Sequence, residues 1–158
     1  MSEHDEAGSR ETDRVEVSTL NMDDLDAVVR IDAKHTGRPR SEFLSKRLEA
    51  ALRDSGIAVA LKAEVDGGMV GFLLGAVHYG EFGMPEPAAV LDVIGVHPDF
   101  EGQHVGAALM AQLEMQLRAL GIESVRTEVE WTQLEMLAFL QHRGFQPAAR
   151  ICLEKKLT

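Results

Sequence analysis

The stretch AAVLDVIGVHPDFEGQHVGAAL, residues 88–109, joins an apolar run to an amphipathic segment through a short turn that contains glycine. Residues 88–96 are apolar except for Asp92, which is typical of a strand covered on both faces. Residues 102–120 repeat apolar side chains at helical spacing and stop before Gly121, which predicts a helix. The first N–H groups of such a helix have no partner within it, so its start favours an anion such as a phosphate.

The segments around this stretch predict a mixed α/β (α+β) fold with a central sheet flanked by helices. Asp-Gly-Gly at residues 66–68 favours a tight turn, so the strands on either side form a hairpin. The expected order is βααβββαβαβ. Strands are predicted at 15–17, 57–65, 69–79, 88–96, 124–130 and 148–157, and helices from Asn21, from Ser41, over 102–120 and over 133–143.

Composition limits the class of protein. The chain has 158 residues, a hydrophobic share of 45% and a net charge of −10, which suits one globular domain and disfavours binding to nucleic acid or to an anionic membrane. Residues 1–13 are acidic and without periodicity, so we expect a flexible tail ahead of a domain over 14–158. We find no signal peptide and no apolar run of about 20 residues, and expect a cytoplasmic location. Cys152, the one cysteine, lies in an alternating apolar run that predicts a buried, inert thiol.

Two motifs resemble a known family. Residues 96–109, VHPDFEGQHVGAAL, resemble the acetyl-CoA-binding motif of the GNAT N-acetyltransferases, whose turn reads Arg/Gln-x-x-Gly-x-Gly/Ala. Residues 138–145, AFLQHRGF, look like that family's penultimate helix with its terminal Gly-Phe. The order of elements from Val15 to Thr158 is similar as well, so the resemblance implies a single-domain GNAT fold and acetyl transfer from acetyl-CoA to an amine.

The resemblance also implies where the cofactor lies. Backbone amides of the turn and helix start would hold the diphosphate, and the strand before them would hydrogen-bond the pantetheine arm, between itself and residues 124–130. The implied cofactor-binding residues are Ile94, Gly95, Val96, Glu101, Gly102, Gln103, His104, Val105, Gly106 and Ala107.

Three positions depart from the family pattern. Glu101 replaces its Arg/Gln, and either faces solvent or competes with the diphosphate for the positive helix end. His104 replaces its first glycine, and keeps its backbone donor provided that the turn needs no positive φ there. Leu140 stands where the family often has a tyrosine acid. These departures leave open an alternative function, a sensor that binds CoA or acyl-CoA without turnover.

Catalysis requires that the acceptor amine lose a proton. Asp92, the one charge in its strand, is the leading candidate for the base, although a structural, hydrogen-bonded Asp92 is the competing reading. Glu81 lies in the loop that would cover the substrate, and Tyr79, the one tyrosine, could replace the missing acid.

The acceptor is expected to meet a second group of side chains. Glu128 and Glu130 share one face of their predicted strand with Arg126 and would form an acidic mouth for an ammonium group. Trp131 either lines the acceptor pocket or caps the core. The acceptor could be a small molecule, a peptide or a protein, and such folds can form homodimers through edge strands or the last helices.

Overall fold

The computed structural model describes residues 14–54 and 57–158, which form two compact units. The first unit ends at Thr127 and contains a five-stranded sheet, whereas the second begins at Glu128 and contains one helix. The acidic tail predicted over residues 1–13 lies outside the described residues.

The sheet of the first unit is mixed, as predicted. Its strands follow one another in chain order, the first four antiparallel and the fifth parallel to the fourth. They are β1 (Glu16–Thr19), β2 (Ala58–Val65), β3 (Gly68–His78), β4 (Ala88–Val96) and β5 (Val125–Arg126). The predicted hairpin is present, because Asp66 (φ 51°) and Gly67 (φ 79°) both adopt the positive φ that a tight two-residue turn requires.

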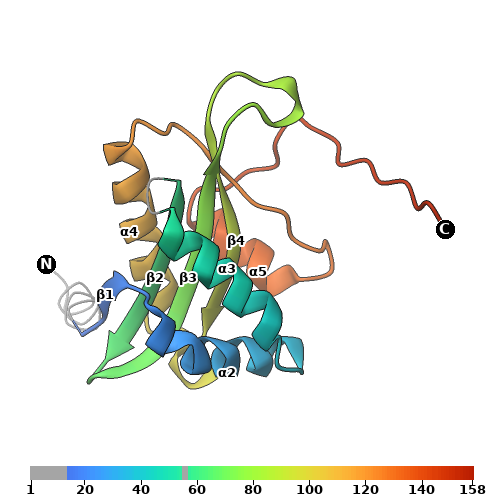
Figure 1. Ribbon diagram of the computed structural model, residues 1–158. Helices are drawn as coiled ribbons and strands as arrows, with labels where there is room; N and C mark the ends of the chain where they lie inside the picture. The colour runs from blue at the N-terminus through green and yellow to red at the C-terminus, as the bar shows by residue number, and fades with distance from the viewer. Residues whose placement is uncertain (1–13, 55–56) are drawn as a thin grey trace, which may run out of the picture. The chain divides into compact units, whose positions relative to one another are not determined.

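Helices cover both faces of this sheet (Figure 1). α2 (Leu25–Thr36) and α3 (Ser41–Arg53) pack on one face, where Phe72, Leu44 and other apolar side chains form a buried cluster. α4 (Val105–Ala119) packs on the opposite face: a Cβ added to Gly71 of β3 would lie 2.8 Å from Val105. The strands are thus buried on both sides, which accounts for their nearly continuous apolar sequences.

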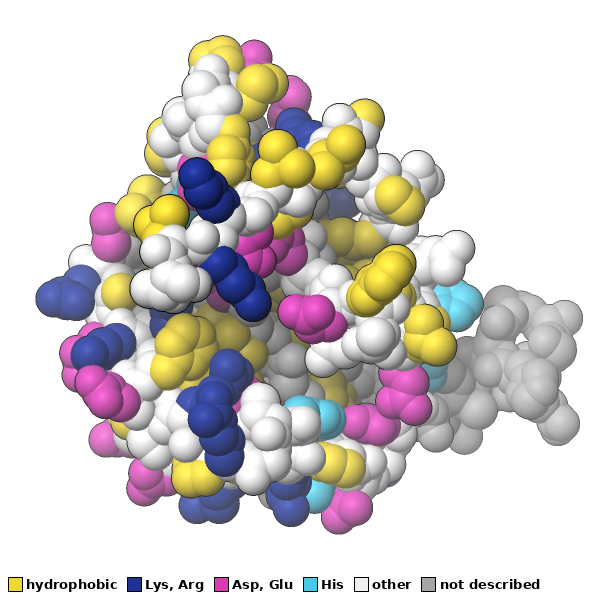
Figure 2. Space-filling view, turned by 90° about the vertical axis from the view of Figure 1, so that its right-hand side faces the viewer, with side chains coloured by type: hydrophobic (Ala, Val, Ile, Leu, Met, Phe, Trp, Pro, Cys, Tyr) yellow, Lys and Arg dark blue, Asp and Glu magenta, His cyan; other side chains and the backbone are white. Residues whose placement is uncertain are grey.

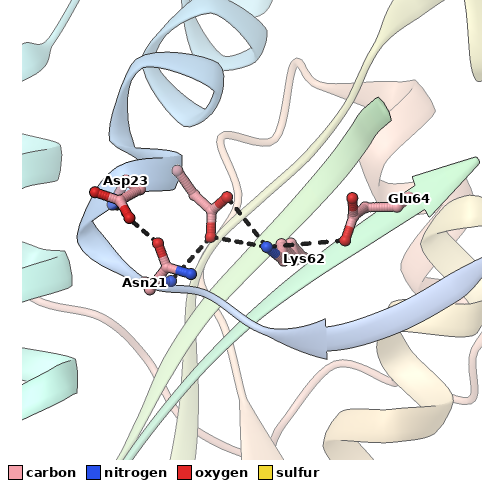
Figure 3. Close-up of polar contacts among 5 residues, drawn as sticks. Asn21, Asp23, Lys62 and Glu64 are labelled. Carbon is pink, nitrogen blue, oxygen red and sulfur yellow. Dashed lines mark hydrogen bonds and ion pairs between the residues drawn. The ribbon is translucent and has the colours of Figure 1, made fainter. Parts of the chain in front are cut away.

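A small polar network fixes the entry to α2 (Figure 3). Asn21 caps η1 (Met22–Asp24), because its side chain accepts from the Asp23 N–H at 2.9 Å while Asp24 accepts from the Asn21 N–H at 2.9 Å. Both oxygens of Asp24 also accept from Lys62 of β2 at 3.1 Å, and both side chains are mostly buried. The predicted cap at Asn21 is confirmed, and its partner Asp24 ties this helix start to the sheet.

Three predicted elements differ from the structure: two have other bounds and one is not formed. α4 begins at Val105 rather than at 102, because Gly102 and His104 adopt positive φ and interrupt the helix. β5 ends at Arg126 instead of continuing to 130. The strand expected over 148–157 is not formed, since a strand exists only where its peptide groups pair with a neighbour.

Because the predicted last strand is not formed, the apolar side chains of this segment are exposed. Ile151 is 85% and Leu153 89% exposed, and the Cys152 thiol is exposed instead of buried as predicted. The second unit retains one helix, α5 (Leu134–His142), close to its predicted bounds. Within the described ranges, no helix combines the length and the apolar character needed to cross a membrane.

Candidate functional site

The edge of β4 opens where β5 ends. The last paired residues are Val90 of β4 and Arg126 of β5, whereas β4 continues to Val96. The Thr127 hydroxyl donates to the Leu91 carbonyl at 2.9 Å, which closes the paired part of the two strands. Beyond Leu91, no strand of the described chain covers the edge of β4 that faced β5.

A β-bulge lies at the point where this edge opens. Leu74 and Gly75 of β3 are consecutive, yet they pair with Val93 and Leu91, so Asp92 is an extra residue in β4. Asp92 contacts α3 while Val93 packs on the cluster beneath α2 and α3, so two successive side chains share one face. Asp92 is exposed as a residue, but its side chain retains only 20% of its accessible surface, so the exposed part is main chain.

Backbone alternation shows which peptide groups face the open edge. The His97 N–H donates to Val70 at 2.7 Å, toward β3, so Ile94 and Val96 direct theirs to the other side. His35, in the last turn of α2, lies with its Nε2 2.6 Å from the Val96 carbonyl oxygen, which accepts the bond. The Ile94 peptide and the Val96 N–H therefore face the edge along which the pantetheine arm was predicted to lie. His35 was not identified from the sequence, which carries no signal that it reaches β4.

Gly95 has a different role from its neighbours. A Cβ added there would lie 2.6 Å from the Phe72 ring and 3.4 Å from Ile31. Its small size therefore serves the packing of α2 on the sheet, on the buried side of β4, and by the same alternation its own peptide groups face β3 and not the open edge.

The turn after β4 leads into the start of α4. Residues 101–104 are exposed, Ala107 is half-buried, and Val105 and Gly106 are buried. His104, at the N-cap position, makes no capping hydrogen bond with its side chain, and no acidic residue of the described chain lies in the first turn of α4. The first amides of α4 thus lie at a positive helix end, an arrangement that suits a diphosphate, whereas the Gln103 N–H already donates to the Phe100 carbonyl at 3.3 Å.

Two expectations for this turn are resolved. Glu101 lies four residues before α4 in extended backbone and is exposed, so it is not the first-turn carboxylate that could occupy the helix end. His104 adopts φ 63°, so this position does require a positive φ, contrary to the condition on which its replacement of glycine was expected to be neutral. Gln103, between them, donates from its side chain to the Asp99 carbonyl at 3.3 Å.

The candidate base Asp92 has a partner that the sequence did not indicate. Arg47 of α3 places its Nη1 3.5 Å from Asp92 Oδ2, and the Arg47 side chain is 49% exposed. Arg47 and Asp92 are 45 positions apart in the sequence, and only the packing of α3 over β4 brings them together.

The other two catalytic candidates lie at the far end of β3. Glu81 is 3.3 Å from Nδ1 of His78 and 3.8 Å from Nη2 of Arg126, whose Nε is buried without a partner in the described structure. Tyr79 is 64% exposed. The Glu81 carboxylate therefore lies between the side chains of His78 and Arg126. In the described structure, the Tyr79 hydroxyl forms no hydrogen bond with any of these three residues.

The predicted acidic mouth does not take the form expected. Glu128 and Glu130 belong to the second unit and are exposed, but no strand continues past Arg126 to align them with it. Trp131 is 85% exposed, and Leu140, at the position of the family's tyrosine, is buried. Figure 2 shows Lys and Arg side chains among Asp and Glu side chains on one face, which is not uniformly acidic despite the net charge of −10.

Comparison with curated proteins finds short matches. The chain is 40% identical over 58 residues to an uncharacterized N-acetyltransferase, ycf52, of Gracilaria tenuistipitata var. liui, which covers 37% of this chain and 30% of that protein. It is 36% identical over 59 residues to a mycothiol acetyltransferase of Propionibacterium freudenreichii, which covers 37% of this chain and 19% of the other. The matches thus span less than a third of the length of these relatives.

Solved structures match over nearly the whole chain. An aminoglycoside N-acetyltransferase in complex with CoA has a TM-score of 0.77 at 17% identity, over 91% of this chain and 95% of that one. A ribosomal-protein-alanine N-acetyltransferase of Brucella melitensis has a TM-score of 0.72 at 21% identity, over 91% and 99%. At such identities these likenesses establish the fold. Residues 23–145 match the model of the acetyltransferase (GNAT) family, and the chain therefore belongs to that family.

Proposed function

We propose that this chain transfers an acetyl group from acetyl-CoA to a primary amine. The observation that carries the proposal is the continuity of the open β4 edge, beginning at the bulge of Asp92, with the start of α4 and its first backbone amides. Membership of the GNAT family supports it, as does the CoA bound to one protein of the same fold.

The backbone between Ile94 and Ala107 fits the two parts of this cofactor. The Ile94 peptide and the Val96 N–H would pair with the amides of the pantetheine arm, as a neighbouring strand would. The diphosphate would lie against the exposed turn, residues 102–104, and the half-buried Ala107 at the helix end. Acetyl-CoA, when bound, supplies a thioester whose carbonyl carbon an amine can attack.

Residues at the bulge would carry the chemistry. Asp92 is the proposed base, which takes the proton that the acceptor ammonium must lose before its nitrogen can attack. Exposed main-chain N–H groups at the bulge would stabilise the negative charge that develops on the carbonyl oxygen. Glu81, held by His78 and Arg126, is a second candidate base, and Tyr79 the candidate acid.

The proposed cofactor site is tested at Gln103, which is exposed and precedes α4. Gln103→Glu adds a negative charge to the turn, and we expect it to weaken CoA binding about tenfold, because like charges about 4 Å apart repel by roughly 1 to 4 kcal/mol. Isothermal titration with CoA measures the change. Gln112→Glu, the same substitution in the middle of α4, serves as the control and should leave the affinity unchanged.

Turnover is tested separately by thiol release from acetyl-CoA with a panel of primary amines. Release that depends on the amine supports the transferase. Tight CoA binding with no release for any amine would favour the alternative, a CoA or acyl-CoA sensor, and an equal loss of affinity in both glutamate variants would place the cofactor elsewhere.

A further inference from the structure

Arg47 and Asp92 form a loose ion pair at the bulge. Their closest atoms are 3.5 Å apart, the Arg47 side chain is 49% exposed and that of Asp92 20%. In the described part of the chain this is the one ion pair of either residue. Both groups therefore keep unused hydrogen-bonding capacity: four or five N–H donors on a guanidinium and most acceptor positions on a carboxylate.

A neighbouring pair shows what a structural contact looks like here. Arg40 donates to both oxygens of Asp32, at 2.8 and 2.7 Å, and the Asp32 side chain is only 5% exposed. These hydrogen bonds raise the pKa of Arg40 above its ordinary value. The bidentate Arg40–Asp32 pair thus joins α2 to the start of α3. The single, longer contact between Arg47 and Asp92 holds α3 to β4 less tightly.

Phe43 helps to hold Arg47 in place. The Arg47 guanidinium lies 5.5 Å from the centre of the Phe43 ring, and Arg40 lies 4.9 Å from the same centre. An aromatic ring restricts a guanidinium without using its N–H groups. Arg47 is therefore positioned and still able to grip a carboxylate with two parallel hydrogen bonds.

We propose that the acceptor, if the chain is the acetyltransferase proposed above, is a free α-amino acid or a similar molecule that carries a carboxylate beside its amine. Its ammonium group would meet Asp92 and its carboxylate would meet Arg47. One carbon separates the two charges of an α-amino acid, so they match the opposite charges of a protein pair whose atoms are 3.5 Å apart.

The reaction at this site is balanced without any further reagent. Asp92 takes a proton from the ammonium group, and the freed nitrogen lone pair forms the new C–N bond to the acetyl carbon. The C–S bond breaks, its electron pair leaves with the sulfur, and the second proton that the nitrogen must lose passes to that thiolate, so CoA departs as a thiol. The carboxylate takes no part in these steps, because Arg47 holds it to fix the direction from which the nitrogen approaches.

The same pair disfavours an acceptor with a second positive charge at this position. An extra ammonium about 4 Å from Arg47 would be repelled by roughly 1 to 4 kcal/mol, depending on exposure to water. The site thus selects for a zwitterion over a polyamine, which Arg47 repels, and over a simple alkylamine, which has no carboxylate for Arg47 to bind.

The test compares free amino acids with their amides and with the corresponding decarboxylated amines, by kcat/KM for thiol release. We expect the wild-type chain to prefer the best amino acid over its amide by at least tenfold. Arg47→Gln should reduce this ratio to about two or less by slowing the amino acid alone, and Arg47→Lys should restore part of it. Arg53→Gln, an exposed arginine of the same helix, is the matched control and should keep the ratio.

Other outcomes would overturn the inference. If amides and decarboxylated amines are acetylated with the same kcat/KM as amino acids, the proposed acetyl transfer is supported but the proposed selection of a zwitterion is wrong. If Arg47→Gln slows every acceptor equally while its melting temperature is unchanged, Arg47 positions Asp92 and does not bind the substrate. If no amine of any class releases thiol, the proposed function itself fails.

Discussion

His104 shows how one backbone angle decides what a substitution does. A non-glycine residue with positive φ stores strain, and His104 does so at φ 63° immediately before α4. The turn that faces the proposed diphosphate therefore depends on a conformation that the family satisfies with glycine. The sequence identified the departure at His104, but its strain depends on a backbone angle that a residue pattern does not give.

The strain at His104 can be measured with two variants that both remove the imidazole. His104→Ala should be less stable than His104→Gly by about 1 kcal/mol, because alanine keeps the steric cost of positive φ and glycine does not. Urea denaturation of both proteins gives the difference in their free energies of unfolding. Because both variants lack the imidazole, the contacts of that side chain do not contribute to the difference. Equal stabilities would show that the turn relaxes to negative φ when the side chain is small.

At the scale of elements, Asp24 connects a helix start to the sheet. Its carboxylate accepts from the Asn21 N–H and from Lys62 of β2, with 17% of its side chain exposed. The adjacent Asp23 is exposed. Only its backbone N–H takes part in the cap, where it donates to the Asn21 side chain. Two neighbouring acidic residues thus have unequal structural weight.

We expect Asp24→Ala to lower the free energy of unfolding by about 2 kcal/mol, since it removes one cap and leaves a mostly buried lysine with only its longer contact to Glu64, at 3.8 Å. Asp23→Ala should cost less than about 0.5 kcal/mol, as is usual for an exposed side chain. Thermal unfolding of both variants tests this. A loss of similar size for the two would mean that Lys62 finds another acceptor, for which Glu64 at 3.8 Å is the nearest candidate.

The elements that the sequence predicted best are those specified by local patterns. The bounds of β4, the start of α3 at Ser41 and the hairpin turn at 66–68 follow from apolar runs, caps and turn residues. The end of β5 was predicted too late, because strand pairing depends on a partner far along the chain. The Arg47–Asp92 pair was missed for the same reason: a sequence pattern does not show which helix packs over which strand.

At the scale of the whole molecule, the sheet packs so closely against the helices on its two faces that two glycine positions have no room for a methyl group. Gly71 of β3 lies against α4, and Gly95 of β4 lies against the Phe72 ring and α2. The sheet and the helices on its two faces are close-packed there, so a side chain added at either position must displace a neighbour.

Gly95→Ala should therefore destabilise the protein by about 2 kcal/mol, because its Cβ would lie 2.6 Å from Phe72. The penalty should shrink in the Phe72→Leu background, where the ring is absent, and a double-mutant cycle measured by urea denaturation reports this coupling. Gly68→Ala is the control, since its nearest neighbour would be 3.8 Å away. An undiminished penalty in the Phe72→Leu background would show that the conflict is not with the Phe72 ring, and Ile31, at 3.4 Å, would be the next neighbour to test.

The extra residue in β4 also governs how the chain can tolerate changes in length. Leu91 and Val93 pair with the consecutive residues Gly75 and Leu74, so the two halves of the strand alternate normally and Asp92 stands outside the register. A single deletion in this strand can therefore be absorbed by loss of the bulge, either because Asp92 itself is deleted or because it is drawn into the paired strand. A shorter β4 would thus keep the sheet and lose the present position of the Asp92 carboxylate.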